Sequence, residues 1–289
     1  MNKSRTTLDY SRRVERVVAH IGAHLDETLE LETLAGIAAF SPYHFHRVYR
    51  SLMGETAADT LRRLRLVRAA GDLVQGAAPM AGIATRAGYG SVAAFTRAFG
   101  AMYGMPPAAY RRRGGLVIPA FQPDTEESTM YDVEFRTTPT LRLAGLRHRG
   151  PYIQIGAAFD RLFARAGGRG LIGPATRMLG IYYDDPQSVP AAALRSDATI
   201  TVGDEVADDG DVRILTLAGG RHAVVLHRGP YSELERAYAW LYRGWLPQSG
   251  HEAADRPCFE EYLNNPRELP PEEWLTAVHL PLMAAEKAA

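Results

Sequence analysis

The sequence predicts two domains of different fold class: an all-α domain over residues 1–113 and an α+β domain behind it. Apolar residues in the front part recur at the spacing of a helix face, whereas the back part combines β-branched runs with two helical stretches. The pentapeptide HRGPY occurs at 148–152 and again at 227–231. Chance does not readily repeat five residues, so we expect two tandem units of similar layout, each read as β-β-α-β-β.

The composition bounds the class of protein. With 46% hydrophobic and 23% charged residues, the chain is globular in type. It contains no apolar run of about eighteen residues, and the first residues carry no apolar signal core, so we expect no membrane association. The single cysteine, Cys258, cannot form an internal disulfide, which favours a reducing compartment. We therefore expect a cytoplasmic protein.

The net charge of zero conceals an asymmetry between the two domains. Residues 1–113 hold 16 Lys and Arg against 9 Asp and Glu, a net of +7, and the remainder holds 17 against 24, a net of −7. Opposite charges predict two kinds of partner: a polyanion for the front domain, and a neutral or cationic molecule for the back domain.

The front domain repeats one helical layout. Helices are predicted over 10–25, 31–38, 42–52, 56–75, 80–87, 91–102 and from 106 to 113. Ser41 and Ser91 are suitable N-caps, and Gly54 is suited to end a helix. A short helix, a turn and a longer helix thus occur twice, which is the layout of two helix-turn-helix units. A helical bundle without nucleic acid is the alternative, but residues 34–113 hold 11 Lys and Arg against only 3 Asp and Glu.

These residues resemble the AraC/XylS-type transcription regulators. The matching patterns are LAxxAxFSxxxFxRxYxxxMG over 34–54 and IAxxAGYxSxxxFxRxFxxxYGxxPxxYR over 83–111. The resemblance implies a DNA-binding domain over 8–113 and base or backbone contacts early in each second helix, at Tyr43, His46, Arg47, Arg50, Ser91, Val92, Ala93 and Arg97. Arg and His can donate to guanine, whereas Val and Ala can only touch thymine methyl groups, so the second unit should discriminate less by hydrogen bonds.

Two features of the front half stay open on sequence alone. The arginines 50, 62, 63, 65 and 68 fit phosphate contacts or a solvated helix surface equally well, and some could pair with Asp59 or Asp72. Residues 114–130, which begin with two glycines and contain two prolines, are predicted to be a linker.

The back domain is predicted over 131–283. Strands are expected over 131–136, 141–147, 178–183, 198–202, 212–217, 222–227, 258–263 and 275–280, with helices over 153–166 and 232–246. HRGPY fits a strand-to-helix corner, because Gly permits unusual dihedral angles and Pro stops the strand. Its His and Arg are therefore expected to be structural.

This half resembles the gyrase-inhibitor-like effector-binding domain. The matching pieces are the HRGPY pair, YYDDP at 182–186, AWLYRGWLP at 239–247, FEEYLN at 259–264 and LPL at 280–282. The resemblance implies two pseudo-symmetric repeats with a ligand cleft at their junction. It also assigns to Glu260 the contact with cationic or polar ligands, although a surface strand position is the alternative for this residue.

The repeats differ where the cleft is expected. Counting back from the closing prolines aligns Glu260 with Gly180, which makes the cleft asymmetric and anionic. Alternation along the strand puts Glu260 and Tyr262 on one face and Glu261 on the other. A cationic ligand between ring faces would offset the cost of a buried carboxylate. The further candidate wall residues are Tyr152, Phe159, Phe163, Tyr182, Tyr242 and Trp245, each of which could instead be ordinary core.

The predicted function is a transcription regulator that binds double-stranded DNA and senses a small cationic or aromatic ligand. The alternatives are a small-molecule hydrolase in the same cleft, with Glu260 positioning water, and a module that docks on RNA polymerase or gyrase. We assign no catalytic residue, cofactor or metal: His44 and His46 do not share a helix face, and the chain has no CxxC or HExxH motif.

Overall fold

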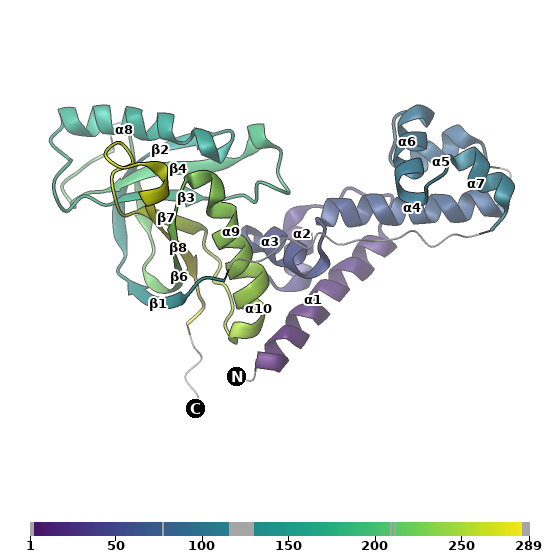
Figure 1. Ribbon diagram of the computed structural model, residues 1–289, viewed down its shortest axis with the longest axis horizontal. Helices are drawn as coiled ribbons and strands as arrows, with labels where there is room; N and C mark the ends of the chain where they lie inside the picture. Colours follow the sequence, from purple (N-terminus) through teal and green to yellow (C-terminus); the bar gives the residue numbers. More distant parts are fainter. Residues whose placement is uncertain (1–2, 77, 116–129, 209, 211, 285–289) are drawn as a thin grey trace.

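The computed structural model describes residues 3–76, 78–115, 130–208, 210 and 212–284, with side chains from residue 9 onward. The sheet domain lies at one end of an elongated molecule, the first helix-turn-helix unit lies against it, and the second unit stands at the far end of a long helix (Figure 1). In the described part of the chain, no helix is both long enough and apolar enough to cross a bilayer.

The front domain is all-helical, as predicted. Its helices are α1 (Lys3–Ala23), α2 (Leu31–Ala38), α3 (Pro42–Met53), α4 (Ala57–Gln75), α5 (Met80–Arg86), α6 (Val92–Tyr103) and α7 (Pro107–Arg113). Ser41 and Ser91 cap α3 and α6 by accepting a backbone N–H from Tyr43 and Ala94. Gly54 ends α3 in the left-handed conformation, at φ 70°.

Each helix-turn-helix unit has its own core. Phe45 and Tyr49 of α3 pack with α1 and α2 in the first unit, and Phe95 and Phe99 of α6 pack with α5 and α7 in the second. Helix α4 contributes to both cores and joins the units. The predicted linker over 114–130 falls mainly on 116–129, which lies outside the described residues.

The back domain is one antiparallel eight-stranded sheet. Its strands are β1 (Val133–Thr138), β2 (Leu141–Arg149), β3 (Met178–Tyr182), β4 (Arg195–Thr201), β5 (Arg213–Leu217), β6 (Gly220–Arg228), β7 (Cys258–Tyr262) and β8 (Leu275–Pro281). They lie in the order β1-β6-β8-β7-β3-β4-β2-β5. The centre of this order falls between β7 and β3, where Gly180 pairs directly with Glu260. The pseudo-twofold axis therefore passes between the two residues that sequence counting had aligned.

The repeats exchange their first strands. β1 pairs with β6 and β5 pairs with β2, although only two residues separate β1 from β2. The β1–β2 and β5–β6 corners pack tightly, since a Cβ on Gly219 would lie 2.5 Å from the backbone nitrogen of Thr140. The exchange interlocks the two repeats, so neither half of the sheet is complete without the other.

Each HRGPY segment forms the strand-to-helix corner that its glycine and proline predict. Gly150 and Gly229 have φ of 124° and 142°, and their N–H groups donate to the carbonyls of Leu194 and Trp274 at 3.0 Å in both repeats. After each corner the chain turns through a short 3-10 segment, η1 (Tyr152–Gln154) or η3 (Tyr231–Glu233), into a helix that covers the sheet.

The two covering helices differ. The first is the regular helix α8 (Gly156–Gly168), whereas the second consists of α9 (Leu234–Ala239), a π-helical turn η4 (Trp240–Trp245) and α10 (Leu246–Ser249). The 3.6-residue periodicity did not predict the π-helical turn. There Gly244 lies under the Trp240 ring, where a Cβ would approach to 2.3 Å. Helices α1 and α3 of the front domain pack against this second helix (Figure 1).

Candidate functional site

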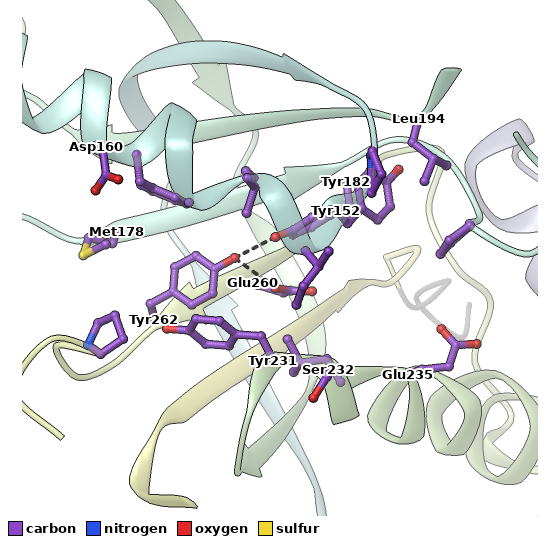
Figure 2. A pocket seen from close by; sticks show the side chains of 18 of the residues that line it. Tyr152, Asp160, Met178, Tyr182, Leu194, Tyr231, Ser232, Glu235, Glu260 and Tyr262 are labelled. Atoms are coloured by element: carbon purple, nitrogen blue, oxygen red, sulfur yellow. Dashed lines mark hydrogen bonds between the residues drawn. The ribbon is translucent and has the colours of Figure 1, made fainter. Parts of the chain in front are cut away.

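A cavity of about 820 Å³ lies between the two covering helices, over β3 and β7 (Figure 2). Residues from both repeats line it, together with one residue of the front domain, Arg47. Its size is that of a site for a drug-sized molecule. The aromatic lining residues are Tyr152, Phe159, Phe163, Tyr182, Tyr231, Tyr238 and Tyr262.

Glu260 lies at the centre of β7 and at the base of this cavity. The residue is 4% exposed, and its carboxylate accepts hydrogen bonds from the hydroxyls of Tyr238 at 3.1 Å and Tyr262 at 3.0 Å. Burial raises its pKa to about 7, while the tyrosine hydrogen bonds and the charge of Arg47 act to lower it. A group with this pKa changes between a neutral and an anionic form near neutral pH.

Two symmetry-related tyrosines explain why the repeats differ at this position. Tyr182 and Tyr262, equivalent residues of the two repeats, join their hydroxyls at 2.6 Å across the axis (Figure 2). A Cβ on Gly180 would lie 2.8 Å from the Tyr262 hydroxyl and from the Tyr182 ring. The tyrosine pair therefore occupies the space that a side chain at 180 would need, and only one carboxylate can stand beside the axis.

Glu261 shows the opposite environment on the other face of β7. Its carboxylate pairs with the guanidinium of Arg177 through two hydrogen bonds, at 2.6 and 2.8 Å. Glu260 has no such partner: no Lys, Arg or His of the described residues forms a salt bridge with it. The alternation of side chains along β7, expected from the sequence, thus places the paired carboxylate of Glu261 on one face and the unpaired carboxylate of Glu260 on the other.

Most of the predicted wall residues meet at the cavity. Glu260, Tyr152, Phe159, Phe163, Tyr182 and Tyr262 all line it. Tyr242 and Trp245 do not: they lie on the π-helical turn, beyond Tyr238, where Tyr242 packs against α3 and Trp245 against Phe135 and His251.

Sequence reasoning missed Tyr231 and Tyr238, although the repeat contained the signal. Tyr231 ends the second HRGPY and corresponds to Tyr152, and Tyr238 corresponds to Phe159 at the same offset of 79 residues. Transferring each predicted wall residue to the other repeat would have found both. The same transfer from Phe163 leads to Tyr242, which lies away from the cavity because the second helix has a different course.

The two candidate DNA-contacting helices differ in exposure. At the start of α6, Ser91, Val92 and Ala93 are exposed, as is Arg97 one turn later. On α3, Arg47 is buried and Tyr43, His46 and Arg50 are only partly exposed, because this face lies against the sheet domain.

The remaining arginines on α4 bond within the chain. Arg62 pairs with Asp59 and Arg63 with Glu55, both at 2.7 Å. Arg68 binds Asp26, and Arg65 donates to the carbonyl of Leu25. The bonds of Arg65 and Arg68 tie helix α4 to the segment after α1, whereas Arg62 pairs within α4, and Asp72 pairs with Arg86 rather than with any of these arginines.

Comparison with known proteins identifies both domains. Residues 131–283 match the model of the GyrI-like small molecule binding domain, and residues 34–113 match that of a helix-turn-helix domain. The first match spans just over half of the chain. This chain therefore belongs to the GyrI-like small molecule binding domain family, and it carries an AraC-type helix-turn-helix domain in front.

Three relatives each match less than half of this chain. A DNA gyrase inhibitor of Edwardsiella piscicida is 34% identical over 145 residues, 48% of this chain and 90% of the relative. An uncharacterized HTH-type transcriptional regulator of Bacillus subtilis (strain 168), YbfP, is 35% identical over 121 residues, 42% of this chain and 40% of that protein. The DNA-binding domain of AdpA, solved with a target DNA, is 34% identical, covers 35% of this chain and 90% of that chain, and has a TM-score of 0.31. The protein is a DNA-binding transcription regulator with a small-molecule binding domain.

Proposed function

We propose that the effector of this regulator is a lipophilic organic cation, bound in the cavity with its charge beside Glu260. The observation that carries the proposal is that Glu260, a residue only 4% exposed, has no salt-bridge partner among the described residues and lies at the base of an aromatic cavity of about 820 Å³. Desolvating a carboxylate is unfavourable, and a cation between ring faces restores the lost interaction.

The other acidic side chains of the cavity are already neutralised. Asp160 pairs with Arg267 at the rim, and Glu235 pairs with Arg50 of the front domain. Glu260 is therefore the carboxylate with which a ligand can form a new ion pair, and the surrounding tyrosines supply the ring faces.

The test compares two ions of the same shape and opposite charge. Tetraphenylphosphonium and tetraphenylborate are titrated against tryptophan fluorescence at pH 8, where Trp274 is a suitable reporter because its ring lies 4.4 Å from that of the cavity residue Tyr231. We expect saturable binding of the phosphonium, weak or no binding of the borate, and at least a tenfold loss of phosphonium affinity in Glu260→Gln. Equal binding of both ions, or an unchanged affinity in Glu260→Gln, would exclude the assignment.

For DNA, we propose that α6 contacts the major groove through Ser91, Val92, Ala93 and Arg97, whose exposure supports this role. Binding at low and high salt tests the contact, because each neutralised phosphate adds to the salt dependence. Contact with RNA polymerase and a cytoplasmic location stay predictions.

A further inference from the structure

Arg47 belongs to the DNA-binding domain, yet it lines the effector cavity. The residue is 9% exposed, and its guanidinium carbon lies 4.4 Å from the ring centroid of Tyr238 and 5.6 Å from that of Tyr242. One guanidinium nitrogen donates to the carbonyl oxygen of Asp184 at 3.4 Å. The two ring faces and the carbonyl offset part of the cost of burying this cation.

Arg47 is also the positive charge that acts on Glu260. Arg50 and Arg267 each have a carboxylate partner, whereas Arg47 forms no salt bridge with any described residue. Its charge is close enough to lower the pKa of Glu260. The cavity therefore already contains a cation and an acid that interact through space without forming a salt bridge.

The docking of Arg47 covers the face of α3 that is expected to contact bases. Tyr43 lies against Tyr183 with ring centroids 6.4 Å apart, and His44 bonds to the carbonyl of Ala254 at 2.9 Å. Ser41, at the start of the helix, donates to Asp255 at 2.7 Å. A helix held in this way cannot enter a major groove, so DNA binding by the first unit requires it to leave the effector-binding domain.

We propose that Arg47 couples ligand binding to release of the first helix-turn-helix unit: a cationic ligand beside Glu260 replaces Arg47 as the positive charge of the cavity, and α3 then becomes available to DNA. The inference rests on the proposed function. Two unit charges about 10 Å apart in a medium of effective dielectric constant near 20 repel enough to shift an equilibrium about tenfold. By linkage, the docked helix weakens binding of the cation by the same factor.

Cross-linking of the docked interface measures the release. In the full-length Ser41→Cys, Asp255→Cys variant, two cysteines replace this hydrogen-bonded pair of side chains, and a mild added oxidant can couple their thiols only while α3 is docked. Native Cys258 is 1% exposed and does not compete. The rate of disulfide formation then reports how much of the protein has α3 docked, while tryptophan fluorescence reports binding in the same sample.

Saturating tetraphenylphosphonium should slow cross-linking about tenfold, and tetraphenylborate should not. Binding of the phosphonium with an unchanged cross-linking rate would overturn the coupling and leave the proposed function standing. Equal slowing by both ions would also overturn it, because shape rather than charge would then be responsible. If neither ion binds, the proposed function fails, and this inference fails with it.

Substitution of Arg47 separates its charge from its packing. Arg47→Gln, added to the double-cysteine variant, should raise the affinity for phosphonium about tenfold and leave the cross-linking rate unchanged when phosphonium binds. Arg47→Lys keeps the positive charge, so phosphonium should still slow cross-linking in that variant. If Arg47 only packs at the interface, both substitutions will lower the basal rate of cross-linking and leave the effect of phosphonium intact, a result that would refute the proposal.

Discussion

Raising the pH from 6 to 8 should strengthen the binding of a permanently charged lipophilic cation about tenfold. The cause is Glu260, whose burial raises its pKa to about 7. The carboxyl group is mostly protonated at pH 6 and mostly ionised at pH 8, and only the ionised form attracts a cation. The affinity should therefore rise through pH 7 and become constant above it.

The magnitude follows from the ionised fraction. A group with a pKa of about 7 is roughly 9% ionised at pH 6 and roughly 91% ionised at pH 8. If the cation binds the ionised form alone, the dissociation constant falls by that ratio, which is about tenfold and corresponds to ~1.4 kcal/mol. Arg47 lowers the pKa of Glu260, so its replacement by Gln should shift the transition to higher pH.

Fluorescence titration with tetraphenylphosphonium at half-unit intervals of pH measures this dependence. The charge of the probe does not change with pH, so any transition belongs to the protein. Glu260→Gln is the matched control, and it should bind weakly with a flat profile. A wild-type profile that is flat between pH 6 and 8, or one whose transition survives in Glu260→Gln, would refute the assignment of the charge to this residue.

Raising the pH, which should strengthen cation binding, should lower the free energy of unfolding of the unliganded protein. The folded-state pKa of about 7 lies above the ordinary value of 4.5, so the folded state retains the proton that the unfolded chain has released. The contribution of Glu260 to stability is full below pH 4.5 and is lost as the pH rises through 7, by roughly 3 kcal/mol. Chemical denaturation should show a smaller loss over this pH range in Glu260→Gln, and an identical loss in both proteins would contradict the buried carboxyl.

Three further substitutions test individual contacts. Gly180→Ala should lower the free energy of unfolding by about 1–3 kcal/mol in chemical denaturation, because the new methyl group displaces the Tyr182–Tyr262 pair. It should also weaken cation binding, and an unchanged affinity would contradict this packing. Arg97→Ala should reduce the slope of log affinity for DNA against log salt by about 1 if Arg97 contacts a phosphate, and no change would remove it from the interface. Trp245→Phe should bind phosphonium with an affinity within about twofold of the wild-type value in the fluorescence titration, since the Trp245 ring lies outside the cavity. A tenfold loss of affinity would place this ring in the binding site.

The difference between the two repeats at Glu260 and Gly180 could be predicted from the sequence, because a duplication keeps equivalent residues at a constant offset along the chain. Glu260 aligns with Gly180 by counting, and in the sheet the two residues pair directly at the pseudo-twofold axis. The aromatic positions transfer between repeats by the same offset where the two helices follow the same course. They cease to transfer at the π-helical turn, because this turn changes the register of the second helix and the 3.6-residue periodicity does not predict it.

The exchange of β1 and β5 between the halves of the sheet was also beyond prediction. A connection of two residues, Pro139 and Thr140, suggests a hairpin, but β1 pairs with β6 and β5 with β2, and the two connections approach closely at Gly219. Pairing between strands depends on contacts that are distant in sequence, and a single chain without aligned relatives contains no direct record of them.

The sequence by itself determined the two domains, their helices and strands, the duplication and the carboxylate at its axis, because these depend on spacing along the chain. Only the tertiary structure decided the role of Arg47. Its position early in the second helix of a helix-turn-helix unit indicates DNA contact, and its burial over Tyr238 in the effector cavity depends on how two separately folded domains meet. The pattern of one domain carries no information about a neighbour that covers it, so the link between cavity and DNA-contacting helix became visible only in three dimensions.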